Sequence, residues 1–301
     1  MQELVGRYSR YLTRTGIWGK KGDLMDVDMK MYLSGEKLYG DDFSLEQLKK
    51  WVEEEAEGYS GLVREAEAAY TYVYHELNKM HGFQYVKLPQ KCIALGVGSA
   101  NCQEFYPILP YLSHITSLEP SNHFSTDKVG GVPVLHVKPS VDGKMPFPDD
   151  HFDVITCFGV LHHIANVTFT IAECFRVLKP GGFMFLREPV VSMGDWRRPR
   201  KGLTKNERGI PYALFINMVK RHNYTIVRLT QFDFAPLGRL LSYFGVSTFS
   251  HRSTTVLDYA LSQIFAFNKK YHRVTRLEKF GPASVYMCLL KNQFSSGSKF
   301  A

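Results

Sequence analysis

The chain has 301 residues, of which 45% are hydrophobic and 14% aromatic, and its 37 Lys and Arg against 29 Asp and Glu give a net charge of +8. This composition excludes an intrinsically disordered chain, and the length suits one large domain or about two ordinary ones. Five cysteines in so long a chain exclude a disulfide scaffold. The N-terminal residues hold no unbroken apolar stretch of the kind found in a secretion signal, and the sequence has no run of about 18 apolar residues. The sequence therefore predicts a cytoplasmic protein with reduced thiols and no membrane span.

The first 88 residues predict a helical extension. Amphipathic spacing is clearest over residues 44–80, where Ser44 followed by Gln47 has the pattern of a capping box. We expect this extension to precede a main domain at 89–292. The small polar residues 293–301 are expected to form a flexible tail.

From residue 91 the pattern changes to short apolar runs separated by helical stretches. The runs predict strands at 91–97, 114–119, 132–137, 152–158, 183–190, 225–232 and 284–291. The stretches between them predict helices at 102–112, 121–128, 165–178 and 210–222, the third ended by Pro180, Gly181 and Gly182. Continuously apolar strands are buried on both faces, so the alternation predicts an α/β fold with a parallel sheet. Residues 236–280 are expected to form an insertion.

A glycine-containing loop, Gly96-Val97-Gly98, follows the first predicted strand. Glycines there let the backbone approach a ligand closely, although an ordinary tight turn has the same pattern. The next strand ends at Glu119, 21 residues after Gly98. An acidic residue about twenty positions on is where a Rossmann-like site binds ribose hydroxyls. The pair therefore favours a nucleoside ligand with free hydroxyls, against the alternative of a solvated surface glutamate.

Four segments together resemble the class I S-adenosylmethionine-dependent methyltransferases, particularly the small-molecule, methyltransferase type 11-like branch. They are ALGVGSAN at 94–101, SLEPS at 117–121, MPFPDDHFDVITCFGVLHHI at 145–164 and AECFRVLKPGGFMFLREP at 172–189. The resemblance implies a Rossmann-like fold with helices on both faces of a seven-stranded, mostly parallel sheet whose last strand is antiparallel. It also implies S-adenosylmethionine as the cofactor, bound at the carboxyl ends of the first strands.

The resemblance further implies which residues bind this cofactor. They are Gly96, Val97, Gly98, Glu119, Pro120, Asp142, Phe158 and Gly159. Glu119 is expected on the ribose hydroxyls, Asp142 on the adenine amino group and Phe158 near the sulfonium. The sequence departs from the family at Ala94, where an acidic residue usually helps to hold the methionine ammonium, and at Ala100, the third glycine position.

Two histidines, His162 and His163, follow the predicted fourth strand. A hydroxyl acceptor benefits from a positioned general base, for which His is the commonest residue, whereas an amine acceptor needs only to be deprotonated. We therefore expect His163 or His162 to act as the catalytic base, with packing alone as the alternative. Neighbouring histidines give no closed ligand set, so the sequence predicts no metal.

A basic loop after the fifth strand carries Arg197, Arg198 and Arg200. Arginines bind phosphate or carboxylate, so these three are expected to bind an anionic acceptor, unless the loop is only a solvated basic surface. The leading hypothesis is O- or N-methylation of a small polar metabolite such as a nucleotide-linked or phosphorylated sugar, in sugar or natural-product biosynthesis. Nucleic acid is disfavoured as a partner because basic and acidic residues are interleaved. A non-catalytic binding module stays open because of Ala94, and a homo-oligomer is possible.

Overall fold

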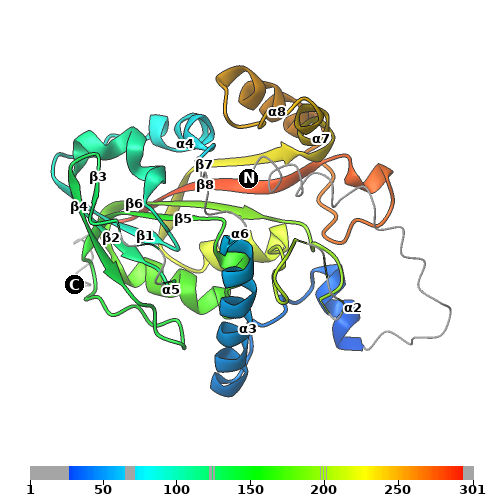
Figure 1. Ribbon diagram of the computed structural model, residues 1–301, viewed down its shortest axis with the longest axis horizontal. Coiled ribbons are helices and arrows are strands. Elements are labelled where there is room, and N and C mark those ends of the chain that lie inside the picture. Colours follow the sequence, from blue (N-terminus) through cyan, green and yellow to red (C-terminus); the bar gives the residue numbers. More distant parts are fainter. Residues whose placement is uncertain are drawn as a thin grey trace, which may run out of the picture.

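The computed structural model describes residues 27–64, 72–121, 124, 126–196, 198, 200 and 202–293. It has an α/β architecture in which one sheet is covered by helices on both faces (Figure 1). Arg197, most of the tail at 293–301 and the first part of the helical extension lie outside the described residues.

The sheet has eight strands in the order β3-β4-β2-β1-β5-β6-β8-β7. The strands are β1 (Cys92–Val97), β2 (Leu112–Leu118), β3 (Lys128–Val129), β4 (Val132–Val137), β5 (Phe152–Phe158), β6 (Leu178–Pro189), β7 (Tyr224–Phe234) and β8 (Pro282–Lys291). β1 pairs in parallel with β2 and β5, β2 with β4, and β5 with β6. β8 runs antiparallel to both β6 and β7, which confirms the antiparallel last strand. The two-residue edge strand β3 is additional to the seven strands expected.

Helices cover both faces of this sheet (Figure 1). The α-helices are α2 (Val27–Ser34), α3 (Leu45–Arg64), α4 (His75–His81), α5 (Val167–Val177), α6 (Tyr212–Lys220), α7 (Ala235–Tyr243) and α8 (Arg252–Ile264). Short 3-10 segments lie at Phe83–Tyr85, Gln103–Tyr111, Leu161–His163 and Leu277–Lys279. α4, α7 and α8 lie on one side, and α3, α5 and α6 on the other (Figure 1). The described part of the extension is helical, and the predicted capping box forms, with the Ser44 amide donating to Gln47 Oε1 at 2.9 Å.

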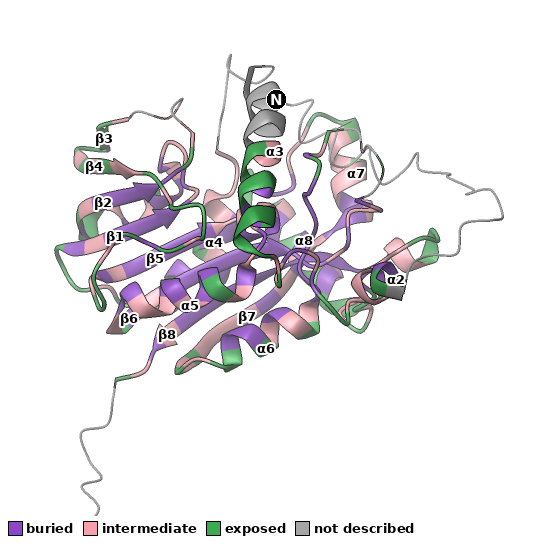
Figure 2. Ribbon diagram, turned by 90° about the horizontal axis from the view of Figure 1, so that it is seen from below, coloured by how far each residue is buried: buried purple, intermediate pink, exposed green. Residues whose placement is uncertain are grey.

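The core consists of the central strands packed against these helices, and Figure 2 shows β1, β5, β6 and β8 as largely buried. Their apolar residues are covered on both sides, as expected for strands with continuous rather than alternating apolar runs. All five cysteines are buried and free. They act in this core as small apolar side chains.

Three predictions of local structure are wrong. Residues 103–111 form a 3-10 helix rather than an α-helix, because Pro107 and Pro110 lack the N–H groups that an α-helix uses. The described residues of 121–128 are not helical, and Lys128 begins β3. α5 ends at Val177, close to its predicted end. The next strand, β6, starts at once at Leu178, so residues 179–182 belong to β6 and do not form a separate turn. They cause an irregularity in the pairing of β6 with β5.

The segment between β7 and β8 carries α7 and α8, and α8 packs on β7. Among the described residues, none of the helices combines the length and the apolar character needed to cross a bilayer.

Candidate active site

The glycine loop joins β1 to the 3-10 helix that follows it. Gly98 has φ of +61°, and its amide donates to the carbonyl of Leu118 at 2.9 Å, which fastens the loop to the end of β2. A Cβ on Gly96 would lie 1.8 Å from Ser99 Oγ, so only glycine lets Ser99 fold back over the strand. Ala100 also takes a positive φ of 45°, in the region that favours glycine. The loop thus keeps the tight conformation although its third glycine position holds alanine.

Glu119 lies directly after β2 and is buried beside this loop. Its Oε2 accepts from the amide of Ala100 at 3.2 Å, and its Oε1 accepts from the amide of Ser121 at 3.0 Å. Burial raises the pKa of Glu119, against the two amides that lower it. The carboxylate is thereby held between the glycine loop and a neighbouring cavity of about 310 Å³. That cavity is lined by Glu119, Ser121, Phe124, Asp127, Val134, His136, Val137 and Lys138.

A second acid beside the glycine loop is missed by the sequence analysis. Glu104 is buried, and its Oε1 accepts from the hydroxyls of Ser99 and, at 3.3 Å, of Thr156. Burial raises the pKa of Glu104 to about 7 despite these hydrogen bonds. Thr156 stands opposite Gly96 in the β1–β5 pairing, so this carboxyl lies against the strand that carries the glycine motif. Ala94, where an acid was expected, is fully buried within the same strand.

Of the remaining predicted cofactor residues, Val97, Pro120 and Asp142 lie in three separate places. Val97 ends β1, and Pro120, exposed, follows Glu119 and accepts from Lys138 Nζ through its carbonyl at 2.7 Å. Asp142 lies in an exposed turn, where its Oδ1 accepts from Ser140 Oγ at 2.5 Å. It is not among the residues that line the cavity beside Glu119.

Phe158 ends β5, and the guanidinium of Arg187 lies 5.1 Å from the centre of its ring. Arg187 is buried and also lies 3.8 Å from the centre of the Tyr74 ring. Gly159, with φ of +71°, follows and donates to the carbonyl of Arg187 at 2.7 Å. The aromatic face expected for the sulfonium is therefore next to a protein cation.

His162 is held by Glu188, the residue before the last of β6. Glu188 Oε1 accepts from the amides of Val160 and Leu161 at 2.8 and 2.9 Å, and its Oε2 lies 2.8 Å from His162 Nδ1. Since a carboxylate only accepts, Nδ1 is the nitrogen that carries the proton. This contact fixes the ring orientation and leaves Nε2 as the nitrogen that faces away from Glu188.

His163 is held by Glu55 from α3. Its Nδ1 lies 3.0 Å from Glu55 Oε2, and its backbone carbonyl accepts from Trp51 Nε1 at 2.7 Å. Burial lowers the pKa of His163, but the hydrogen bond to Glu55 and the charges of Glu207, Glu55 and Glu188 outweigh it, so the pKa is raised above its usual value. The side chain remains 27% exposed, so solvent or a substrate can reach it.

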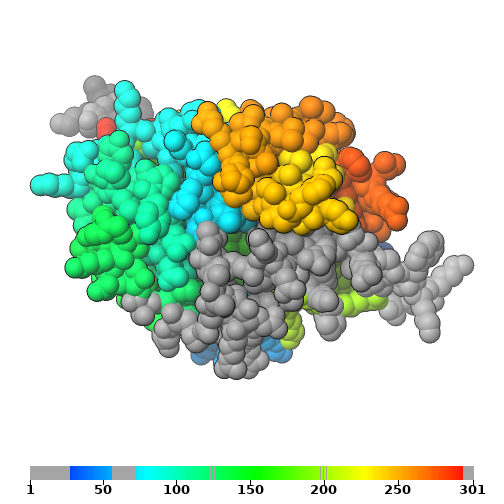
Figure 3. Space-filling view, turned by 45° about the horizontal axis from the view of Figure 1, so that its top comes forward, coloured from blue at the N-terminus to red at the C-terminus, as the bar shows by residue number. Residues whose placement is uncertain are grey.

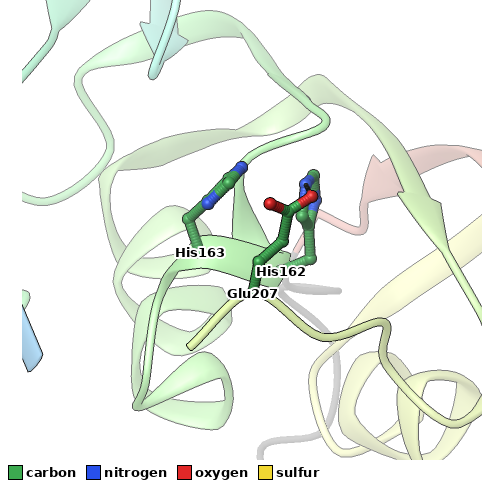
Figure 4. A group of neighbouring side chains, drawn as sticks. All are labelled: His162, His163 and Glu207. Atoms are coloured by element: carbon green, nitrogen blue, oxygen red, sulfur yellow. Dashed lines mark ion pairs between the residues drawn. The ribbon is translucent and has the colours of Figure 1, made fainter. Parts of the chain in front are cut away.

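Glu207 completes this group and is a second residue that the sequence analysis misses. Its Oε1 lies 3.6 Å from His162 Nε2, and its Oε2 accepts from the amide of Thr204 at 3.0 Å. Figure 4 shows the Glu207 carboxylate beside the His162 ring, with His163 on its other side. One ligand atom from each of His162, His163 and Glu207 falls within 4.8 Å of the others, so the three side chains could also hold a metal ion.

The guanidinium of Arg208 fixes the turn that carries both histidines. It donates to the carbonyls of Leu161 at 3.2 Å, His162 at 3.0 Å and Ala165 at 3.0 Å, and its Nε donates to the carbonyl of Tyr39 at 2.9 Å. Burial lowers the pKa of Arg208 to about 10, so the side chain stays charged near neutral pH. One buried cation thus ties the extension to the histidine turn.

Two of the three predicted acceptor-binding arginines are described. Arg198 is exposed, and its Nε lies 3.9 Å from Asp195 Oδ2. Arg200 instead donates to four backbone carbonyls of its own loop, those of Met193, Thr204, Lys205 and Glu207, at 2.5 to 3.3 Å. These hydrogen bonds stabilise the conformation of the segment that carries Glu207.

Comparisons with known proteins show which family part of this chain resembles. Residues 94–186 match the model of a family described as "Methyltransferase domain". The chain is 27% identical over 114 residues to a probable S-adenosylmethionine-dependent methyltransferase of Mycolicibacterium smegmatis, covering 37% of this chain and 44% of that protein. It is 31% identical over 106 residues to a ubiquinone/menaquinone biosynthesis C-methyltransferase of Vibrio parahaemolyticus, covering 33% of this chain and 41% of that protein. The chain thus spans less than half the length of these curated relatives.

The fold has counterparts among solved structures. One is a complex of the Haloferax volcanii Trm112 methyltransferase activator with a candidate methyltransferase, at a TM-score of 0.50 and 13% identity, covering 80% of this chain and 98% of that chain. At this identity the likeness concerns the fold alone. The sheet order, the glycine loop with its acidic partner and the matched family model together identify residues 94–186 as a class I S-adenosylmethionine-dependent methyltransferase domain.

Proposed function

We propose that this protein is a methyltransferase that uses S-adenosylmethionine to methylate a small polar, anionic acceptor, such as a nucleotide-linked or otherwise phosphorylated sugar, on oxygen or nitrogen. The observation that carries the proposal is the buried Glu119 carboxylate between the glycine loop and the adjoining cavity. Residues 1–88 are proposed as a helical extension, 89–292 as the methyltransferase domain and 293–301 as a tail.

The donor set fits the cofactor. Each Glu119 oxygen accepts one backbone amide and keeps a further lone pair, which suits the two hydroxyls of a ribose. Gly96, Val97 and Gly98 would lie along the methionine and ribose portion, with Pro120 and Asp142 toward the base and Phe158 and Gly159 toward the reacting end. S-adenosylmethionine, when bound, supplies the methyl group.

We also propose that Glu104 replaces the acid missing at Ala94. Its carboxyl is buried against the strand of the glycine motif, and its raised pKa of about 7 means that a bound ammonium would favour the ionised form. The methionine ammonium of the cofactor supplies such a charge. Glu104 would therefore supply, from the side of the glycine loop, the carboxylate that is missing from the strand at Ala94.

His163, with His162 beside it, is proposed to take the proton of a hydroxyl acceptor. Glu55 orients the His163 ring and stabilises the imidazolium that proton uptake creates, as Glu188 does for His162. Because the pKa of His163 is raised, the neutral form that can accept a proton becomes the major form only at a higher pH than for an ordinary histidine. The carboxylate partners engage both Nδ1 atoms, which orients each ring for proton transfer and leaves both Nε2 atoms available to a metal ion as well.

The acceptor is proposed to be anionic because of the basic loop. Arg198 is exposed there and Arg197 precedes it, while Arg200 holds the loop that presents them. Guanidinium groups bind phosphate in a forked geometry that neutral acceptors do not exploit.

Calorimetric titration with S-adenosylhomocysteine tests the cofactor part. The Glu119→Ala variant should bind about 5- to 150-fold more weakly, as expected for the loss of hydrogen bonds to a charged group worth about 1 to 3 kcal/mol. Glu46→Ala, which removes an exposed carboxylate from α3, is the matched control and should bind like the unaltered chain. Equal affinity in the Glu119 variant would remove Glu119 from the site, and no binding by the unaltered chain would favour a non-catalytic module.

Transfer of a labelled methyl group tests the acceptor class. Phosphorylated and nucleotide-linked sugars should be methylated in preference to neutral sugars and RNA. Exchanging Arg197 and Arg198 for Ala should raise KM for the acceptor and spare cofactor affinity. If a chelator abolishes the activity and a divalent ion restores it, the two histidines bind a metal ion and the proton-transfer role proposed for them is wrong.

A further inference from the structure

Helix α8 exposes apolar residues and buries polar ones. Thr255, Asp258 and Ser262 point into the protein, at the spacing of one helical face. Val256, Leu257 and Ile264 are 44%, 47% and 64% exposed. This arrangement is the reverse of that of an ordinary surface helix, whose apolar stripe faces the core.

The neighbouring segments continue this apolar surface. Leu240 and Tyr243 share one face of α7, Phe244 follows directly at its C-cap, and Tyr243 is 86% exposed. After α8, Phe267 is 79% exposed and Leu277 is 83% exposed. We call the surface formed by residues 235–280 the α7–α8 face. Figure 3 shows α7, α8 and the residues that follow as a continuous part of one side of the molecule.

The α7–α8 face is also strongly basic. Residues 236–280 hold seven Lys and Arg and only two acids, Asp258 and Glu278, of which Asp258 is buried. Arg252 is exposed at the start of α8, and Arg276 is exposed in the stretch that follows α8. Glu278 is paired with Lys270 at 2.5 Å, so little negative charge faces solvent.

We propose that the α7–α8 face docks on the surface of an anionic lipid bilayer. Exposed Tyr, Phe and Leu side chains enter the boundary between headgroups and acyl chains, while lysines and arginines bind anionic headgroups. The face has both components. The protein would thus bind a membrane peripherally, through an insertion between β7 and β8.

Charge favours a bilayer over a second copy of this chain. In a two-fold dimer the same surface meets itself, so the excess basic residues of one face would meet those of the other. An anionic headgroup layer neutralises them instead.

A cavity of about 500 Å³ adjoins the face and is lined by Lys30 of α2 together with Lys269, Lys270, Tyr212 and Val274. Lys269 Nζ lies 5.0 Å from the centre of the Tyr212 ring. Ammonium groups around one hollow suit a phosphate-bearing headgroup.

Co-sedimentation of the full chain with vesicles tests the proposal. Vesicles of phosphatidylcholine with about 30% phosphatidylglycerol should pellet the protein at low salt, whereas phosphatidylcholine alone or about 0.5 M NaCl should weaken binding. The double variant Tyr243→Ser, Phe244→Ser and the charge variant Arg252→Glu, Arg276→Glu should each bind about tenfold more weakly. Leu45→Ser, which changes an exposed leucine on α3 outside the face, should bind like the unaltered chain.

Thermal unfolding and affinity for S-adenosylhomocysteine establish that each variant is folded, and they separate this proposal from that of the cofactor site. The proposal is overturned if the unaltered chain does not pellet with anionic vesicles, or if the face variants pellet as well as Leu45→Ser. It is also overturned if light scattering finds a dimer that the Tyr243, Phe244 variant dissociates while vesicle binding is absent. If soluble inorganic phosphate alone releases the protein from vesicles, the cavity lined by lysines binds a free anion rather than a lipid headgroup. That result would also overturn the proposal that the face binds a bilayer.

Discussion

Burial places the ionisation of Glu104 close to physiological pH. Its carboxyl has hydroxyl partners from Ser99 and Thr156 rather than a paired cation, so desolvation raises its pKa to about 7. A ligand that brings a positive charge next to this carboxyl must therefore compete with a proton. Cofactor binding and pH are coupled through this one residue.

Affinity for S-adenosylhomocysteine should rise as Glu104 ionises. Between about pH 6 and about pH 8 the ionised fraction changes from about one tenth to about nine tenths, so the association constant should increase by up to about tenfold. Glu104→Gln should be nearly independent of pH over this interval, because the amide cannot ionise. Calorimetry at several pH values measures both slopes, and parallel slopes would assign the pH dependence to another group.

The sequence predicts the residues of the site that follow strands, but not the residues that reach the site only through tertiary packing. Gly98 and Glu119 follow strands whose apolar runs are plain in the sequence, so their meeting at one sheet edge is predictable. Glu55 reaches His163 across 108 residues of sequence, and no local pattern encodes that contact. Glu104 is hidden for a similar reason, since only the packed structure reveals that it is buried.

At the scale of elements, Asp258 links α8 to the end of β7. Its two carboxyl oxygens accept the amides of Asp233 at 2.9 Å and Phe234 at 2.7 Å. Burial and the charge of Asp233 raise the pKa of Asp258 to about 7, and burial raises that of Asp233 to about 6. The inverted helix α8 is thus fixed to the sheet through a polar contact, which explains why its buried face is polar.

Ionisation of this pair should destabilise the fold. Both pKa values are raised, so the folded protein retains protons that the unfolded chain loses above about pH 4, and the free energy of unfolding falls as pH rises toward about 8. Asp258→Asn should flatten this fall by the order of 2 kcal/mol. Urea unfolding at several pH values measures it, with the exposed Asp42→Asn as the control. An unchanged slope would mean that the pair does not control the pH dependence.

The elements themselves differ in how far sequence predicts them. Strands β1, β5 and β8 are buried on both faces, so continuous apolar runs identify them. The segment 102–112 has helical spacing as well, but the missing donors of Pro107 and Pro110 convert it to a 3-10 helix. The spacing of apolar residues does not reveal the missing N–H donors of prolines. The edge strand β3 has only two residues, which is too short to give a recognisable sequence pattern.

At the scale of the whole molecule, several contacts join the extension to the turn that carries His162 and His163 and to the loop beside it. Glu54 of α3 pairs with Lys205 and accepts from Asn206 Nδ2 at 3.0 Å, and Glu55 accepts from the hydroxyl of Thr204 at 2.6 Å. Trp51 reaches the carbonyl of His163 from the same helix. Since the loop at 202–208 also carries Glu207 and Arg208, the geometry around the histidines depends on α3 being docked.

Loss of this docking should be visible in amide hydrogen exchange. Removing Glu54 and Glu55 together, as Glu54→Ala, Glu55→Ala, deletes several hydrogen bonds to charged groups, each worth about 1 to 3 kcal/mol, so amides of 202–208 and 161–163 should exchange at least about tenfold faster. Amides of β1 and β2 should keep their protection, because their partners lie within the sheet. Glu53→Ala, an exposed neighbour on the same helix, controls for the loss of one α3 carboxylate. If both histidine and loop amides keep their protection in the double variant, α3 does not hold the site together, because the turn would then be stable through Glu188 and Arg208 alone.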